Sequence, residues 1–308
     1  MNRVLGRGGV KVEYNKLRFR SDGTFTIIQF TDMHIKDGIE PEKDAQTLAL
    51  MQQIIASQKP DLIVLTGDVI SSYDVEDQEG TFRRAIAGVA ESAIPFAVIY
   101  GNHDSEKGIT RQRLNEILND YANNLSEDGP EDIHGVGNYV LTVSGTMSEE
   151  DAAVLYFFDS GESAPESVGG YEWIHSDQVH WYCKESSQLA QKNGSLLPGL
   201  AFFHIPIPEY EQVWREGTSI GNKGEEVCCP KLNSGLFTAM LEQGDVMGTF
   251  AGHDHDNDYE GVLHGIRLCY GRVTGYNTYG ELERGARIIT LFEGKREFDT
   301  WIKAAKSF

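Results

Sequence analysis

The chain has 308 residues, of which 40% are hydrophobic, and 47 acidic against 27 basic residues give a formal net charge of −20. A chain of this length can bury a sizeable core in one or two domains. The charge argues against a nucleic-acid backbone or an anionic membrane surface as partner, since both need a basic face. A small phosphorylated substrate remains possible, provided that its site is locally positive.

The sequence shows no pattern typical of a membrane span, a secretory signal or a set of disulfides. No apolar run approaches the roughly 20 residues of a membrane span, and the basic segment 1–22 lacks the apolar stretch of a secretory signal. We therefore expect a soluble, cytoplasmic protein. The cysteines form neither a CxxC pair nor a disulfide framework, which argues against a thiolate zinc site; they are Cys183, Cys228, Cys229 and Cys269.

Five short apolar runs, rich in β-branched and aromatic residues, predict buried strands. They are Thr26–Thr31, Leu62–Thr66, Phe96–Tyr100, Leu200–Phe203 and Val246–Ala251. Helical patterns over 43–58 and 78–92 separate the first three runs. This alternation indicates βαβ units and a mainly parallel sheet.

The second half of the chain predicts a second sheet. Its expected elements are strands at Asn138–Val143 and Ala153–Phe158, a helix capped by Ser176 or Asp177, a helix capped by Ser234, and a strand-rich tail over 260–303 with a hairpin at His264-Gly265. No repeat or linker divides the chain, so we expect one domain over 1–308, with 1–22 as an N-terminal extension or edge strand. The predicted fold class is α/β: two packed mixed β-sheets flanked by helices, a four-layer α/β/β/α sandwich. A dinucleotide fold is not indicated, because no GxGxxG follows a strand.

A polar cluster terminates each of the five predicted strands. In chain order the clusters are Asp32-Met33-His34, Gly67-Asp68, Gly101-Asn102-His103-Asp104, His204 and Gly252-His253-Asp254-His255. Ligand sites in open α/β sheets lie at the carboxyl ends of strands. Alternate residues of an extended segment point the same way, so D-x-H and H-x-H should each present two ligands to one point. Alone, an Asp after a strand is usually a turn former or a helix cap, and an isolated histidine is more often structural than a ligand, but five such clusters together predict a metal site.

The residue types indicate which ions would bind. Oxygen and imidazole ligands without thiolate suit Mn, Fe, Zn or similar ions. Seven ligands are too many for one tetrahedral ion, but they suit two ions about 3.5–4 Å apart that share a carboxylate. Two divalent ions bring roughly four positive charges, of which Asp32 and Asp68 offset two, so the pocket would attract phosphate.

In this order, D-x-H, G-D, G-N-H-D, a lone H and G-H-x-H resemble the calcineurin-like metallophosphoesterase signature, from Asp32 to His255. Other stretches are similar to the small purple-acid-phosphatase-like proteins of plants, fungi and bacteria, some of which carry the label "probable inactive". These stretches are FFHIPIPEY (202–210), NSGLF (233–237), GHDHDNDYEG (252–261) and CYGRVTGYNTYG (269–280).

The resemblance implies a role for each matching residue. A first metal would be held by Asp32, His34 and His255, and a second by Asn102, His204 and His253, with Asp68 bridging the two. His103 would contact the phosphate and protonate the leaving oxygen, and Asp104 would orient His103. A metal-bridging hydroxide would then attack phosphorus in line.

The sequence departs from true purple acid phosphatases at one ligand. Those enzymes have G-D-x-x-Y, whose tyrosinate binds ferric iron and gives the colour. Here the corresponding residue is Ser71, and Tyr73 comes two positions too late, while His34 adds a nitrogen ligand. We therefore expect no purple colour.

Other residues are candidates to surround the pocket. Arg272, Tyr276 and Tyr279 follow the last metal cluster and would line the mouth, with Arg272 holding a second phosphate or a carboxylate; the alternative is packing in the strand-rich tail. His134, in an acidic glycine-rich loop, is a further candidate, whereas His175, His180 and His264 are typical of surface or cap residues.

The function we expect is hydrolysis of small phosphate monoesters at a dinuclear metal centre. Two alternatives remain at this point: a phosphodiesterase using the same site, and a regulatory protein that binds metal and phosphate without turnover. The native substrate, the physiological metal pair and the oligomeric state are not indicated by the sequence.

Overall fold

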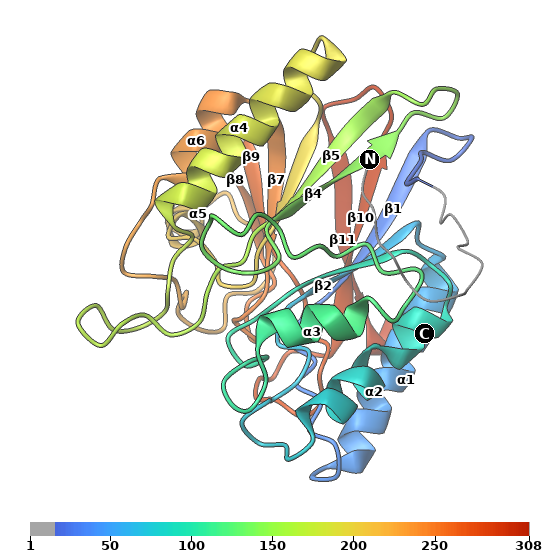
Figure 1. Ribbon diagram of the computed structural model, residues 1–308, viewed down its shortest axis with the longest axis vertical. Coiled ribbons are helices and arrows are strands. Elements are labelled where there is room, and N and C mark those ends of the chain that lie inside the picture. The colour runs from blue at the N-terminus through green and yellow to red at the C-terminus, as the bar shows by residue number, and fades with distance from the viewer. Residues whose placement is uncertain (1–15, 308) are drawn as a thin grey trace.

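The structure is a computed structural model and describes residues 16–307 (Figure 1). Two mixed sheets pack face to face. The five-stranded sheet has the order β11 (Phe298–Ala304), β10 (Gly285–Phe292), β1 (Thr24–Phe30), β2 (Leu62–Thr66) and β3 (Phe96–Ile99). The six-stranded sheet has the order β4 (Tyr139–Ser144), β5 (Asp151–Phe157), β6 (Gly199–Phe202), β7 (Val246–Ala251), β9 (Ile266–Tyr270) and β8 (Glu260–Leu263).

Helices cover the outer face of each sheet, as Figure 1 shows. The five-stranded sheet carries α1 (Pro41–Gln58), α2 (Gln78–Glu91) and α3 (Arg111–Leu118); the six-stranded sheet carries α4 (Ser176–Asn193), α5 (Glu209–Arg215) and α6 (Leu236–Gln243). A short 3₁₀ turn, η1 (Ala305–Ser307), follows β11. The predicted α/β/β/α sandwich is therefore confirmed. Within residues 16–307, no helix combines the length and the apolar character that crossing a membrane requires.

The alternation of strand side chains builds three buried layers. In β1, Ile28 and Phe30 face the helices α1 and α2, whereas Phe25 and Ile27 face the other sheet and meet residues such as Phe202. All five side chains are fully buried, and each contributes about 1.5–3 kcal/mol through apolar burial. Because successive residues point to opposite faces, a strand buried on both faces is apolar at most of its positions.

The structure corrects the predicted elements in several places. The tail divides between the sheets: β8 and β9 form the predicted hairpin in the six-stranded sheet, but β10 and β11 return as antiparallel strands of the first sheet. Helices α3 and α5 were not predicted. The cap of α4 is His175 rather than Ser176 or Asp177, and the cap of α6 is Gly235 rather than Ser234. Of the predicted extension 1–22, residues 1–15 lie outside the described residues, and Arg18 forms an isolated bridge with Ser144.

Candidate metal centre

The predicted ligands lie where five strands of the two sheets end. Asp32 and His34 follow β1, Asp68 follows β2 and Asn102 follows β3 in the first sheet; His204 follows β6, and His253 and His255 follow β7, in the second. All seven side chains are buried, and Asn102 is the most exposed of them at 8%. The sandwich therefore brings together side chains that are more than 200 positions apart in the sequence.

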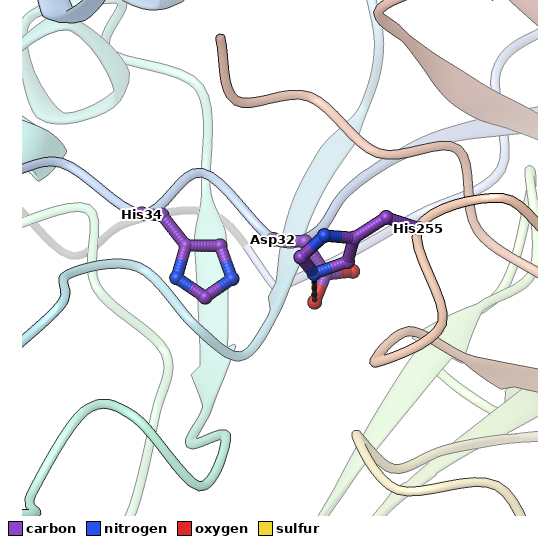
Figure 2. Close-up of side chains that lie close together, drawn as sticks. All are labelled: Asp32, His34 and His255. Atoms are coloured by element: carbon purple, nitrogen blue, oxygen red, sulfur yellow. Dashed lines mark ion pairs between the residues drawn. The ribbon is translucent and has the colours of Figure 1, made fainter. Parts of the chain in front are cut away.

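Two groups of potential ligand atoms form at this edge. Asp32, His34 and His255 make one group, and Asp68, His204 and His253 make the other. In Figure 2 His255 Nε2 points at Asp32 Oδ1, and the two atoms are 3.5 Å apart. Asp68 Oδ2 lies 3.4 Å from His34 Nε2 and 3.2 Å from His204 Nε2, so this carboxylate oxygen faces an imidazole from each group.

The backbone conformation that brings these ligands together differs from the predicted one. Asp32 (φ 55°), His34 (φ 46°), Asp68 (φ 50°) and His253 (φ 78°) all adopt the left-handed region. D-x-H and H-x-H therefore contain left-handed residues and are not extended throughout, so the period-two explanation was wrong. Non-glycine residues pay roughly 1–3 kcal/mol for such a conformation, which persists only where the surroundings impose it and which is concentrated at functional sites.

Glycines let neighbouring turns approach closely. A Cβ on Gly101 would lie 2.1 Å from Asp68 Oδ1, and one on Gly67 would lie 2.6 Å from His204 Nδ1. A Cβ on Gly252 would lie 2.0 Å from Thr31 Oγ1 and 2.9 Å from Asp32 Oδ2. The glycines before Asp68, Asn102 and His253 thus leave room for the segments that carry the ligands to approach one another.

Hydrogen bonds at Nδ1 fix the orientation of three imidazoles. His204 Nδ1 lies 2.8 Å from the carbonyl of Thr66, His255 Nδ1 lies 2.8 Å from Thr278 Oγ1, and His34 Nδ1 lies 3.1 Å from Ser71 Oγ. Such contacts leave Nε2 to face the site, which is the usual arrangement around a histidine that binds a metal. The sequence analysis did not identify Thr66 and Thr278 as partners of these histidines, because no motif marks either threonine as such a partner.

Several buried polar atoms of the site lack a hydrogen-bond partner. They are His34 Nε2, Asn102 Oδ1, His204 Nε2 and His253 Nε2. Unpaired buried polar atoms are costly and call for an explanation. All four belong to predicted ligands, and imidazole nitrogen and amide oxygen are ligands for transition-metal ions. The residues present therefore fit a two-metal centre.

The electrostatics of His34, His253 and Asp68 also suit metal ligands. Burial lowers the pKa of His34 to about 3, and burial together with the neighbouring His204 lowers the pKa of His253 to about 3. Both imidazoles are therefore neutral at pH 7, which is the form that binds a metal. Burial opposes ionisation of Asp68, but the surrounding histidines outweigh it and hold the pKa of this carboxyl well below its usual range.

The sequence assigned the wrong partner to His103. Its Nδ1 lies 2.8 Å from Glu106 Oε2, whereas Asp104 accepts hydrogen bonds from the backbone N–H groups of Ile70 (3.0 Å) and Gly101 (2.8 Å). Burial, and then the charge of Asp68, raises the pKa of Asp104 to about 7. Asp104 thus braces the loop, and Glu106 contacts the imidazole. The sequence could have indicated this partner, because Glu106 is an acidic residue only three positions after His103.

A cavity of about 350 Å³ opens beside this group. Its lining includes His34, His103, His255, Glu106, Tyr73 and Tyr279. The side chain of His103 is 40% exposed there, whereas the ligand side chains are buried. The ring of Tyr279 stacks on His255 with 4.0 Å between centroids. A molecule that enters the cavity from solvent would therefore reach His103 before the buried ligands.

Two predicted substrate residues do not line this cavity. The Arg272 guanidinium is 8% exposed, pairs with Asp258 and donates to the carbonyl of Glu283. Tyr276 packs against the core between the first sheet and its helices. The expected role of Arg272 and Tyr276 at the mouth is therefore wrong, because Asp258 and Glu283 occupy the Arg272 guanidinium and Tyr276 packs on the core. Tyr279, from the same stretch, does line the cavity. His134 lies with Glu172 and His175 instead.

Comparison with known proteins agrees with this geometry. The family model described as calcineurin-like phosphoesterase matches residues 25–257. The chain belongs to the calcineurin-like phosphoesterase family. It is 36% identical to the "probable inactive purple acid phosphatase 29" of Arabidopsis thaliana, over 95% of this chain and 84% of that protein. It is 32% identical to "phosphatase DCR2" of Saccharomyces cerevisiae, over 97% of this chain and 57% of that protein.

A solved structure shares the fold of this calcineurin-like phosphoesterase. A dimetal phosphatase from Danio rerio superposes with a TM-score of 0.62 at 13% identity, covering 90% of this chain and 98% of that one. The predicted family and the predicted two-sheet sandwich are thus confirmed. Members of this family use a dinuclear metal centre, and the two ligand groups are candidates to hold it.

Proposed function

We propose that the chain is a dinuclear metal-dependent phosphohydrolase that acts on small phosphate monoesters in the cytoplasm. The observation that carries the proposal is His103, a partly exposed imidazole that lies beside two buried ligand groups at the wall of a cavity. A protein that only stored metal would need the ligands but no imidazole in reach of substrate. The supported reaction is therefore hydrolysis rather than binding alone.

The ions would be held by Asp32, His34 and His255 in one group and by Asn102, His204 and His253 in the other, with Asp68 facing both. Mn, Fe, Zn or similar ions would supply Lewis acidity toward the phosphoryl oxygens and toward a water molecule. The chain itself supplies orientation: Ser71, Thr278 and the Thr66 carbonyl hold the imidazoles.

His103 would deliver a proton to the leaving oxygen of the ester. Glu106 holds its Nδ1 at 2.8 Å, and the backbone N–H of His103 donates to Asp68 Oδ1 at 2.9 Å. The first contact orients the imidazole of His103, and the second holds its backbone. A positioned general acid contributes about 10²–10⁴-fold to such a reaction.

The cavity supports a substrate larger than phosphate itself. Its volume of about 350 Å³ leaves room for an ester group, and Tyr73 (65% exposed) and Tyr279 (55% exposed) offer aromatic surface in its lining. The same room admits a second ester group, so phosphodiesterase activity is the alternative. The name "probable inactive purple acid phosphatase 29" of the Arabidopsis relative favours a third candidate, a regulatory protein that binds metal and phosphate without turnover.

One experiment separates these functions. Chelator-stripped protein is reloaded with Mn, Fe, Zn or Ni and assayed with p-nitrophenyl phosphate and with bis-p-nitrophenyl phosphate, alongside His103→Ala. We expect metal-dependent turnover that is faster on the monoester and is lost in the variant while two ions per chain remain bound. Faster diester turnover would favour the phosphodiesterase. No turnover with any metal, in protein that binds two ions, would favour the regulatory protein.

A further inference from the structure

A second set of metal-ligand side chains lies apart from the seven residues above. His134 Nε2 is 2.9 Å and His175 Nε2 is 3.1 Å from the same oxygen, Glu172 Oε1. The two imidazoles stack, with 3.7 Å between centroids and an interplanar angle of 14°. The three ligand atoms all lie within 4.8 Å of one another. Two imidazoles thus converge on one carboxylate.

The backbone around this cluster is held by hydrogen bonds that are partly or fully buried. The His134 N–H donates to Asp177 Oδ2 at 2.9 Å, and the His175 N–H donates to Gln178 Oε1 at 2.6 Å. Gln178 is fully buried, and its amide donates to Asn138 Oδ1 and to the carbonyl of Asp159, each at 2.7 Å. Both histidines are therefore anchored to one polar network below the surface.

The carboxylate is held from the other side. Glu172 Oε2 accepts a hydrogen bond of 3.2 Å from the Glu162 N–H, and a Cβ on Gly161 would come within 2.4 Å of that oxygen. The loop therefore closes over Glu172 where a glycine allows it. This leaves Oε1 directed at the two imidazoles, with the side chain of Glu172 only 18% exposed.

We propose that His134, Glu172 and His175 form a third metal site, for a divalent transition-metal ion of the Zn²⁺ class. Two imidazoles and one carboxylate are a ligand set that zinc accepts, with a fourth position left for water or another ligand. A metal lies near the plane of the ring that binds it, so each ring would tilt from its stacked position toward the ion. A cavity of about 280 Å³, which His134 and Glu172 help to line, provides space for the fourth ligand.

The position of the site suggests what the ion would do. Tyr171, the residue before Glu172, places its ring edge-on against His253 at 4.3 Å between centroids. Glu162, whose N–H holds Glu172, also pairs with Ser105 in the loop that carries His103. An ion at the third site would tie the loop that carries His134 to the segment that carries Glu172 and His175, and so would steady contacts to both halves of the dinuclear centre.

The test is a metal count. Chelator-stripped protein is dialysed against Zn²⁺, and the zinc bound per chain is measured for wild type, for His134→Ala combined with His175→Ala, and for Glu172→Gln. The control is His180→Ala, an exposed histidine on α4 outside the cluster. We expect both cluster variants to bind one ion fewer than wild type and His180→Ala to match wild type. Equal zinc in all four proteins would overturn the proposal.

A conservative variant and a second background show whether a lost ion belongs to the third site. Glu172→Gln retains both imidazoles and an oxygen that can accept from the Glu162 N–H, so it decides the matter if the double variant does not fold. The count is repeated in an Asp68→Asn background, which weakens the dinuclear centre. If the cluster variants still bind one zinc ion fewer than the protein that carries Asp68→Asn alone, the third site is separate from the dinuclear centre. A difference that vanishes there would assign the ion to the dinuclear centre and reject the third site, whatever the phosphatase assay shows.

Discussion

The imidazole of His103 is held by Glu106, with 2.8 Å between Nδ1 and Oε2, and not by the adjacent Asp104. Two carboxylates follow this histidine, and the structure gives them separate tasks. Glu106 is partly exposed at the cavity, whereas Asp104 is fully buried behind the loop. Variants of the two residues should therefore fail in different ways.

Glu106→Gln should reduce turnover while leaving the fold intact. Outer partners of this kind commonly affect activity by about 10–100-fold, and a half-exposed ion pair contributes only about 0–1 kcal/mol to stability. We expect slower hydrolysis, most of all for esters with poor leaving groups, with unchanged metal content and melting temperature. Glu76→Gln, at an exposed carboxylate in the loop before α2, is the control. Equal rates for the two variants would remove Glu106 from the mechanism.

Asp104→Ala should instead destabilise the protein. Its carboxylate accepts from two buried backbone N–H groups, those of Ile70 and Gly101. Leaving such donors unpaired costs about 1–3 kcal/mol each, so urea unfolding should show a loss on the order of 3 kcal/mol. Asp104→Asn keeps one acceptor oxygen and should lose less. If Asp104→Ala unfolds like wild type and is slow only on poor leaving groups, Asp104 orients His103 after all.

The sequence predicted the sheets and the ligands because both depend on local patterns. Leu62–Thr66 and Val246–Ala251 are strands with the predicted bounds, since a strand buried on both faces forms a short, mostly apolar run. The return of β10 beside β1 depends on pairing between residues some 260 positions apart, which no local pattern specifies. The same holds for Arg272, whose partner Asp258 is set by the packing of the tail.

The backbone conformation of the site could not be predicted for a different reason. The spacing of Asp32 and His34 is equally compatible with an extended segment and with two left-handed residues, and the second is the conformation present. Left-handed aspartate and histidine are uncommon enough that sequence alone favours the extended alternative. The sequence therefore indicated which side chains gather at the site, but not the way in which they converge.

Gly101→Ala should abolish metal binding at the second group. The new methyl would lie 2.1 Å from Asp68 Oδ1 and 2.5 Å from the Asp68 nitrogen, so the loop or the carboxylate must move. Gly88→Ala in α2 is the matched control, since its Cβ would meet only the flexible end of Gln52 at 3.4 Å. Alanine there should stabilise the helix by up to about 1 kcal/mol. Metal content and melting temperature distinguish the two; normal metal content in Gly101→Ala would contradict the packing argument.

Iron-loaded protein should lack the visible absorption of a tyrosinate bound to ferric iron. Ser71 occupies the tyrosine position, and its hydroxyl lies 3.1 Å from His34 Nδ1, where it orients the imidazole. Tyr73 is 65% exposed, and the Lys107 ammonium lies 5.3 Å from the centre of its ring. The spectrum of the ferric protein should therefore match that of Tyr73→Phe. A visible band in wild type that disappears in this variant would show that Tyr73 replaces the missing ligand.

Metal removal should lower stability through the two ligand groups. Asp32 and Asp68 are each 1% exposed and share the site with imidazole nitrogens that lack other partners. An ion that binds only the folded chain stabilises it by about 2.7 kcal/mol at a free concentration 100 times its dissociation constant. Adding Mn²⁺ or Zn²⁺ to chelator-treated protein should thus raise the melting temperature, and Asp68→Asn should reduce that rise because an amide carries no charge to offset the ions. An equal rise in both proteins would place the stabilising ion somewhere other than at Asp68.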